Sequence, residues 1–186
     1  MLLDMHWLDD VRPPPPSAPP LAPRRRRSRS PQGFLQPGLS VLGPLVGHWD
    51  AEINLHAGGF VHQDLRARGR CHIRVGSQGH TLEMESRLTG WMGTADGHAV
   101  IAPEAVPGTF SMFVAEPFAP ASQAYAGQQI ARDAVVFEGA AELGGVSGVV
   151  RRTLRYGADA HGWTVAFWSE GDVIRLITGR LRRRAR

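Results

Sequence analysis

The sequence predicts an all-β fold, an antiparallel barrel of about nine or ten strands, and three observations lead to this prediction. Apolar and polar residues alternate along much of the chain, which is the period of a strand with one buried face. The 22 glycines and 14 prolines are typical of proteins in which many turns join short strands. The hydrophobic fraction of 42% is sufficient for one core, so the fold needs neither a metal nor a disulfide.

Residues 1–37 are predicted to be a disordered tail, and residues 38–186 the barrel domain. The tail contains RPPPPSAPPLAP, in which proline lacks the amide donor and fixes φ, and then RRRRSRSP, whose charges repel one another. We interpret it as a solvated segment or as sequence upstream of the true start; binding of acidic lipid or nucleic acid is the alternative. The short apolar segment that follows, LSVLGPLVG, is interrupted by Pro44 and is predicted to form one helical turn.

Charge and cysteine content limit the function classes. Arginine supplies all 21 basic residues, and ten of them lie in two clusters, Arg24–Arg29 and Arg180–Arg186. The body of the chain is therefore near neutral, and no nucleic-acid partner is expected. The single cysteine excludes an intrachain disulfide. No apolar run reaches the roughly 18 residues of a membrane span, and no signal-peptide pattern is visible, so we expect a cytoplasmic protein.

The strands follow one another at short spacing. The first, Trp49–Ala57, places Trp49, Ala51, Ile53 and Leu55 on one face. The clearest alternation lies in a hairpin over Asp64–Leu88. Further strands are expected at Ala99–Ala102, Thr109–Ala115, Gln123–Gly127, Ala134–Glu138, Gly148–Tyr156, Gly162–Ser169 and Val173–Leu181. A meander of this length can avoid open edges by closing into a barrel, and barrels of eight or more strands can hold a small ligand.

The sequence of this hairpin also predicts which residues of its two strands lie opposite one another. A two-residue loop at Ser77–Gln78 places apolar residues opposite one another on one face and opposite charges on the other. The expected pairs are Val75 with His80, Ile73 with Leu82, His72 with Glu83, Cys71 with Met84, and Arg70 with Glu85.

Gly47-His48-Trp49 matches the G-x-W signature in the first strand of lipocalins and their calycin relatives. This resemblance implies that Trp49 plugs the closed end of the barrel and packs against an arginine of the last strand. Arg180 is the better candidate for that arginine and Arg182 the alternative. Contact between indole and guanidinium is a favourable cation–π interaction.

A wider set of motifs resembles one bacterial family. LVGHWDAE, VVFEG, RRTLRYGADAHGWTVAFWSEGD and GRLRR, within Leu42–Arg183, are similar to a family of uncharacterised single-domain proteins with a domain of unknown function. The resemblance implies a calycin-like barrel, also called lipocalin- or nitrobindin-like, and no assigned activity. These motifs concern turns and plugs, so they indicate fold and not function.

Two better understood relatives are disfavoured on particular residues. Nitrobindin-type barrels hold haem iron through a histidine of the C-terminal strands. No histidine occurs between Gly162 and Leu181, and His161 is placed at a strand edge, so no cofactor is expected. Fatty-acid-binding barrels hold a carboxylate with an R-x-Y pair, whereas Arg155 and Tyr156 are adjacent here and point to opposite faces.

The residues predicted to contact a ligand are those that would face the lumen. Arg152 and Tyr156 share a strand face, and Arg152, if internal, is a buried cation able to meet an anion. Apolar contacts are predicted from two further strands, by Phe110 and Met112 and by Trp163 and Phe167. The predicted ligand is a small, apolar or weakly anionic molecule; the alternative is a lumen filled by side chains.

Two other functions remain open. An isomerase or cyclase working in the lumen would need an internal acid–base pair, and the nearest carboxylates, Glu85, Glu138 and Glu142, form no convincing pair, so no catalytic residue is predicted. The other alternative is a structural or interaction protein without a ligand, for which a homodimer is considered. The eight histidines show no metal-binding spacing, so no metal site is predicted. Cys71 is expected to be a small buried hydrophobe.

Overall fold

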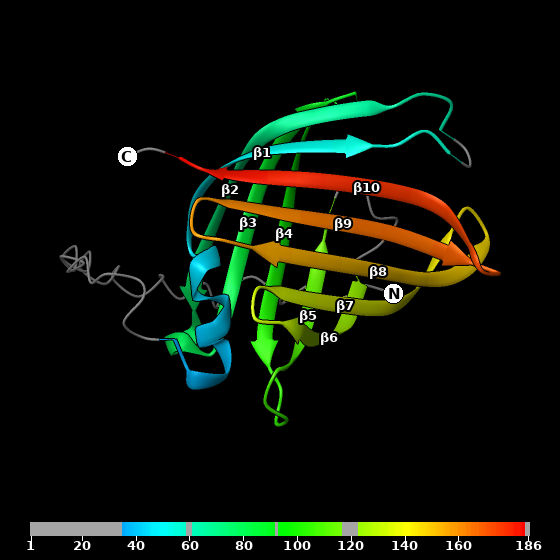
Figure 1. Ribbon diagram of the computed structural model, residues 1–186. Helices are drawn as coiled ribbons and strands as arrows, with labels where there is room; N and C mark the ends of the chain where they lie inside the picture. Colours follow the sequence, from blue (N-terminus) through cyan, green and yellow to red (C-terminus); the bar gives the residue numbers. More distant parts are fainter. Residues whose placement is uncertain (1–34, 59–60, 92, 117–122, 185–186) are drawn as a thin grey trace, which may run out of the picture.

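The protein forms one closed antiparallel barrel of ten strands, seen in a computed structural model that describes residues 35–58, 61–91, 93–116 and 123–184 (Figure 1). Each strand pairs with its neighbours in the chain, and β1 pairs with β10 to close the barrel. This confirms the predicted all-β antiparallel barrel. The strands are β1 Gly47–Leu55, β2 Leu65–Gly76, β3 Thr81–Gly90, β4 Gly93–Pro103, β5 Thr109–Ala115, β6 Gln123–Ala131, β7 Ala134–Leu143, β8 Val146–Tyr156, β9 Ala160–Ser169 and β10 Asp172–Arg183.

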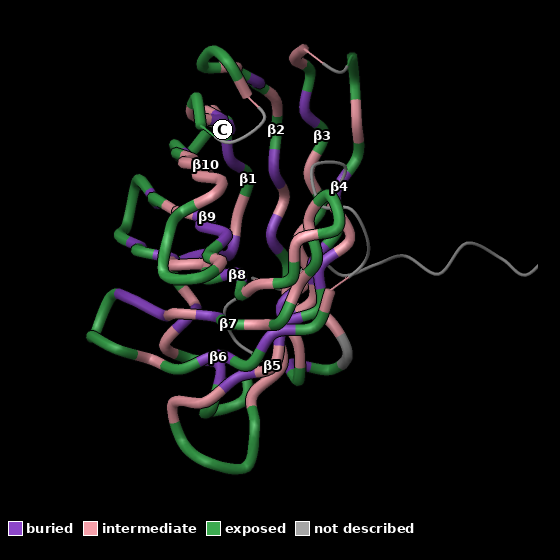
Figure 2. The backbone as a smooth tube through the Cα atoms, turned by 90° about the vertical axis from the view of Figure 1, so that its right-hand side faces the viewer, coloured by how far each residue is buried: buried purple, intermediate pink, exposed green. Residues whose placement is uncertain are grey.

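The predicted alternation sorts side chains between lumen and solvent. In β1, Trp49, Ala51, Ile53 and Leu55 are all buried, whereas none of the residues between them is. Figure 2 shows buried segments recurring along the strands between exposed ones. Successive strand residues point to opposite faces, so one face of every strand supplies the core.

The β2–β3 hairpin differs from the predicted register. Ile73 lies opposite Met84, not Leu82, and His72 lies opposite Glu85, not Glu83. The loop is longer than the predicted two residues because Ser77–Gly79 forms the short 3-10 turn η3, with left-handed φ values of 58° at Gln78 and 94° at Gly79. The resulting shift of two positions keeps each side chain on its predicted face.

A 3-10 helix, η2 (Pro37–Leu45), covers one end of the barrel (Figure 1). It spans nine residues, more than the single turn predicted, and buries Leu39, Leu42 and Leu45. The described structure begins at residue 35, two residues before the predicted tail boundary at residue 37. Leu35 packs against the core, and the Gln36 amide donates to the Gly79 carbonyl at 3.1 Å. Residues 1–34 of the predicted tail lie outside the described residues.

Trp49 forms the plug beneath this helix, and its arginine partner is Arg183. The Trp49 indole Nε1 donates to the Leu45 carbonyl at 2.8 Å, and the Arg183 Cζ lies 4.3 Å from the indole centroid. The predictions of Arg180 and of Arg182 as this partner are wrong. Strand β10 runs on to Arg183, which lies directly opposite Trp49, while Arg180 lies opposite Glu52 and is exposed.

Gly47 is needed at the entrance to β1. Its φ is 151°, and a Cβ there would lie 2.8 Å from the Arg183 Nη1. Arg183 also donates from Nη2 to the Pro44 carbonyl at 3.0 Å and from Nε to the Ala158 carbonyl at 2.9 Å. One arginine therefore ties η2, β10 and the β8–β9 turn together, and a side chain at position 47 would displace it.

Within the described residues, none of the helices is long and apolar enough to cross a membrane.

Candidate functional site

A cavity of about 90 Å³ lies in the barrel lumen. One water molecule needs roughly 10–15 Å³, so the cavity is several times larger than a single water site. Its walls are mostly apolar and come from strands all around the barrel; they include Ala51, Ile53, Ala99, Met112, Val114 and Leu181. The lumen is therefore not completely filled by side chains, and its surface suits an apolar molecule.

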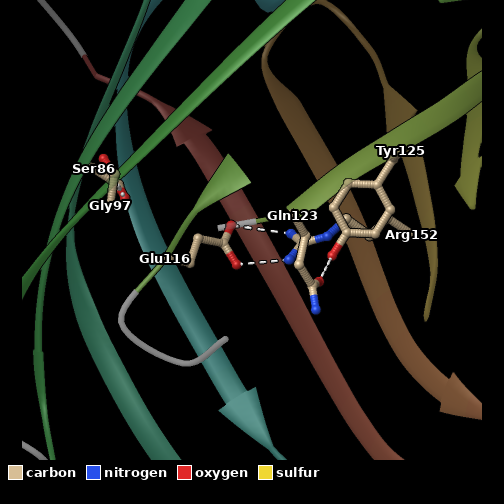
Figure 3. Close-up of polar contacts among 6 residues, drawn as sticks. All are labelled: Ser86, Gly97, Glu116, Gln123, Tyr125 and Arg152. Carbon is tan, nitrogen blue, oxygen red and sulfur yellow. Dashed lines mark hydrogen bonds and ion pairs between the residues drawn. The ribbon is translucent and has the colours of Figure 1, made fainter. Parts of the chain in front are cut away.

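Arg152 is a charged residue of the lumen wall, and Glu116 is its partner (Figure 3). The Arg152 Nη1 donates to Glu116 Oε1 at 3.0 Å, and Nη2 donates to Oε2 at 2.9 Å. The Arg152 side chain is 12% exposed and that of Glu116 25% exposed. Two parallel charge-assisted hydrogen bonds fix the plane of the guanidinium.

The surroundings of Arg152 keep it charged and leave its Nε without a hydrogen-bond partner among the described residues. Burial by itself lowers its pKa, but the charge and hydrogen bonds of Glu116 outweigh burial and raise the pKa above its usual value. The Arg152 Cζ lies 5.0 Å from the centroid of the Tyr125 ring, whose hydroxyl donates to Gln123 Oε1. The Nε of Arg152 is buried and has no hydrogen-bond partner among the described residues. Buried donors are usually paired, and an unpaired one calls for an explanation. A ligand acceptor that binds this N–H would supply one.

A second, smaller pocket of about 40 Å³ lies towards the barrel end opposite η2, which we call the mouth. It shares Glu116 and Arg152 with the lumen cavity and is also lined by Arg175 and Glu142. A β-bulge between Val173 and Arg175 places Arg175 opposite Phe167, an inward-facing residue. Arg175 shares the inward face of β10 with Ile177 and Leu181, and the extra residue turns Val173 to the outer face.

Four of the six predicted ligand contacts line one of these pockets. Met112 and Trp163 line the lumen cavity, Phe167 lines the mouth pocket, and Arg152 lines both. Phe110 and Tyr156 line neither pocket because they lie at the end covered by η2.

The side chains of those two residues are engaged in the core. The Phe110 ring lies 6.4 Å from that of Phe137, and the Tyr156 hydroxyl donates to the Arg132 carbonyl at 3.4 Å. Burial and the charge of Asp133 raise the pKa of Tyr156. Arg152 and Tyr156 therefore share a strand face but do not share a pocket.

Sequence reasoning missed two residues of the site, Glu116 and Arg175. A signal for Glu116 was present: it continues the inward series Phe110, Met112 and Val114 one step past the predicted strand. A signal for Arg175 was present as well, because strict alternation places it on the same face as Ile177 and Leu181; the bulge changes the face of Val173.

Two of the carboxylates considered for an acid–base centre lie outside the lumen. Glu85 and Glu138 face solvent and bind Arg74 and Arg151. Cys71 is buried in the lumen wall, as predicted, and burial followed by the charge of Glu116 raises its pKa to about 12. Its thiol is protonated at neutral pH and a poor nucleophile. The described part of the chain contains no group of three or more acidic, histidine or cysteine side chains able to hold a metal ion.

The comparison with known proteins shows a shared barrel fold and no more. The chain is similar to the crystal structure of Rv2717c from M. tuberculosis, with a TM-score of 0.61 and 14% sequence identity. The match covers 81% of this chain and 99% of Rv2717c. No protein-family model and no curated protein matches the sequence.

Proposed function

We propose that this protein is a calycin-like barrel that binds one small, largely apolar molecule in its lumen. The observation that carries the proposal is the apolar cavity with a single buried arginine at its wall, whose Nε–H has no partner in the described structure. An apolar cavity supplies the free energy of binding through burial, and a few convergent polar groups orient the ligand.

The cost of the Arg152–Glu116 pair supports a functional role. Removing two charges from water is expensive, and well-packed apolar residues of similar size often stabilise a core as well or better. An ion pair that is largely removed from water and leaves the Arg152 Nε unpaired is therefore not expected to increase the folding stability much. It is a good device for holding a hydrogen-bond donor rigidly at the edge of an apolar cavity.

The experiment compares a lumen substitution with a matched surface substitution. Ala99 is buried in the cavity wall, whereas Ala124 is exposed on the outside of β6. An environment-sensitive apolar fluorophore is titrated into wild type, Ala99→Phe and Ala124→Phe, with folding checked by circular dichroism. The proposal expects binding to wild type and Ala124→Phe and its loss in folded Ala99→Phe.

Two further measurements keep the test decisive. If Ala99→Phe does not fold, Ala51→Val adds less volume to the same cavity and is expected to weaken binding. Native mass spectrometry of protein from its own source is expected to show a bound small molecule. Equal fluorophore binding to the folded lumen and surface variants would show that the probe does not enter the barrel, and the proposal would be wrong.

A further inference from the structure

Two arginines converge on the mouth pocket, and they differ in how their charges are balanced. Arg152 is held by Glu116 through two hydrogen bonds, so its charge is already compensated. Arg175 lines the same pocket and makes no hydrogen bond or ion pair with the residues the structure describes. The pocket therefore presents one uncompensated guanidinium beside a compensated one.

Arg175 lies on the inward face of β10, the face that also carries Ile177 and Leu181, next to a β-bulge at the start of the strand. The bulge in β10 inserts one residue between Val173, which lies opposite the outward Trp168, and Arg175, which lies opposite the inward Phe167. Bulges are frequent beside binding sites, where they change the direction of one side chain. Turning a cation towards an apolar lumen has no benefit for folding unless something anionic meets it.

The free donors point to one kind of partner. The Nε of Arg152 is buried without a hydrogen-bond partner, and no nitrogen of the Arg175 guanidinium has a partner among the described residues. Guanidinium groups bind carboxylates through short, charge-assisted hydrogen bonds, and a partly desolvated site strengthens them. The acidic residues of the pocket are Glu116, which Arg152 neutralises, and Glu142, which is exposed at the rim.

We propose that the mouth pocket binds the carboxylate of an amphipathic ligand, with Arg175 supplying the charge and the Arg152 Nε–H a second donor. The apolar tail of this ligand lies in the lumen cavity. This inference rests on the proposed function, because it assigns the polar end of the molecule that the lumen holds. It also gives the ligand an orientation, with its carboxylate towards the barrel end opposite η2.

The test separates charge from hydrophobicity with two probes of equal chain length, octanoate and 1-octanol, titrated by calorimetry. Wild type is compared with Arg175→Gln, with Glu142→Gln, and with Arg155→Gln as control, because Arg155 is exposed on the outside of β8. Arg175→Gln is expected to weaken octanoate binding about tenfold, the lower end of the range for hydrogen bonds to charged groups. Octanol binding should be unchanged, and Arg155→Gln should alter neither probe.

Glu142→Gln provides the opposite perturbation at the same pocket. Removing the rim carboxylate reduces repulsion, so octanoate is expected to bind several-fold more tightly. The inference is overturned if Arg175→Gln leaves octanoate affinity unchanged, or if octanoate binds wild type no better than octanol. It is also overturned if the apolar fluorophore binds and octanoate does not; in all three cases the lumen function stands. Failure of octanoate, octanol and fluorophore alike would remove the proposed function itself.

Discussion

Acidification is expected to destabilise the barrel through His161. This residue is 2% exposed, and its ring centroid lies 3.9 Å from that of Trp49. Its Nδ1 accepts the Gly157 amide at 3.3 Å, while Nε2 has no partner among the described residues. Burial, and then the positive charge of Arg183, lower the pKa of His161 from 6.5 to about 4. Between about pH 4 and pH 6.5, His161 is therefore mostly neutral in the folded protein and mostly protonated in the unfolded chain.

The direction and size of the change in unfolding free energy follow from this difference in pKa between the folded and unfolded states. Between pH 6.5 and pH 4 the unfolded chain binds more protons at His161, so stability falls as the pH falls. One pKa unit corresponds to about 1.4 kcal/mol, so the whole shift is worth about 3 kcal/mol. Most of that loss, about 2 kcal/mol, should be present at pH 4.5. Above pH 6.5 the contribution is complete, and below pH 4 it no longer changes.

The assay is urea unfolding of wild type and His161→Asn at pH 7 and pH 4.5. Asparagine keeps an acceptor for the Gly157 amide and does not titrate, so subtraction removes the contributions of other groups. Wild type is expected to lose about 2 kcal/mol more than the variant on acidification. Equal losses in the two proteins, or an NMR titration of His161 near pH 6.5, would refute the reasoning.

Three further substitutions test the packing of the barrel. Glu116→Gln leaves the Arg152 guanidinium without its counter-charge and should lower the free energy of unfolding, measured in urea, by about 3 kcal/mol. Replacing Glu116 with leucine and Arg152 with methionine in one variant should lower it by less. A larger loss in the double variant than in Glu116→Gln would contradict the pairing. Trp49→Ala should lower the free energy of unfolding by about 3–5 kcal/mol, and a loss below about 1 kcal/mol would show that the plug is dispensable. Gly179→Ala puts a Cβ against the indole of Trp163 and should cost about 1–3 kcal/mol and weaken fluorophore binding; unchanged binding would place Trp163 outside the site.

Strand faces could be predicted from sequence because the pleat has a period of two and one face of each strand meets the lumen. The inward series that begins at Trp49 needs only this rule. Register could not be predicted in the same way. A two-residue and a four-residue loop after Gly76 preserve the same faces, and the left-handed conformations of Gln78 and Gly79 decide between them.

The site was only partly predictable because its partners come from distant strands. The position of Arg152 on an inward face follows from alternation, but Glu116 lies 36 residues away and meets it only when the barrel closes. The choice of Arg183 over Arg180 depends on the β1–β10 register, which joins the two ends of the barrel domain. The bulge that turns Val173 to the outer face has no marker in the local sequence.

The central claim is that an apolar ligand occupies the barrel lumen, and intermolecular NOEs test it most directly. With octanol or octanoate bound, the account predicts NOEs from the alkyl chain to the Met112 ε-methyl and the Leu181 methyls, which line the cavity. No NOEs are expected to the exposed Val149 and Val173 on the outer face. A ligand that binds and shows NOEs only to those outer valines would contradict the account.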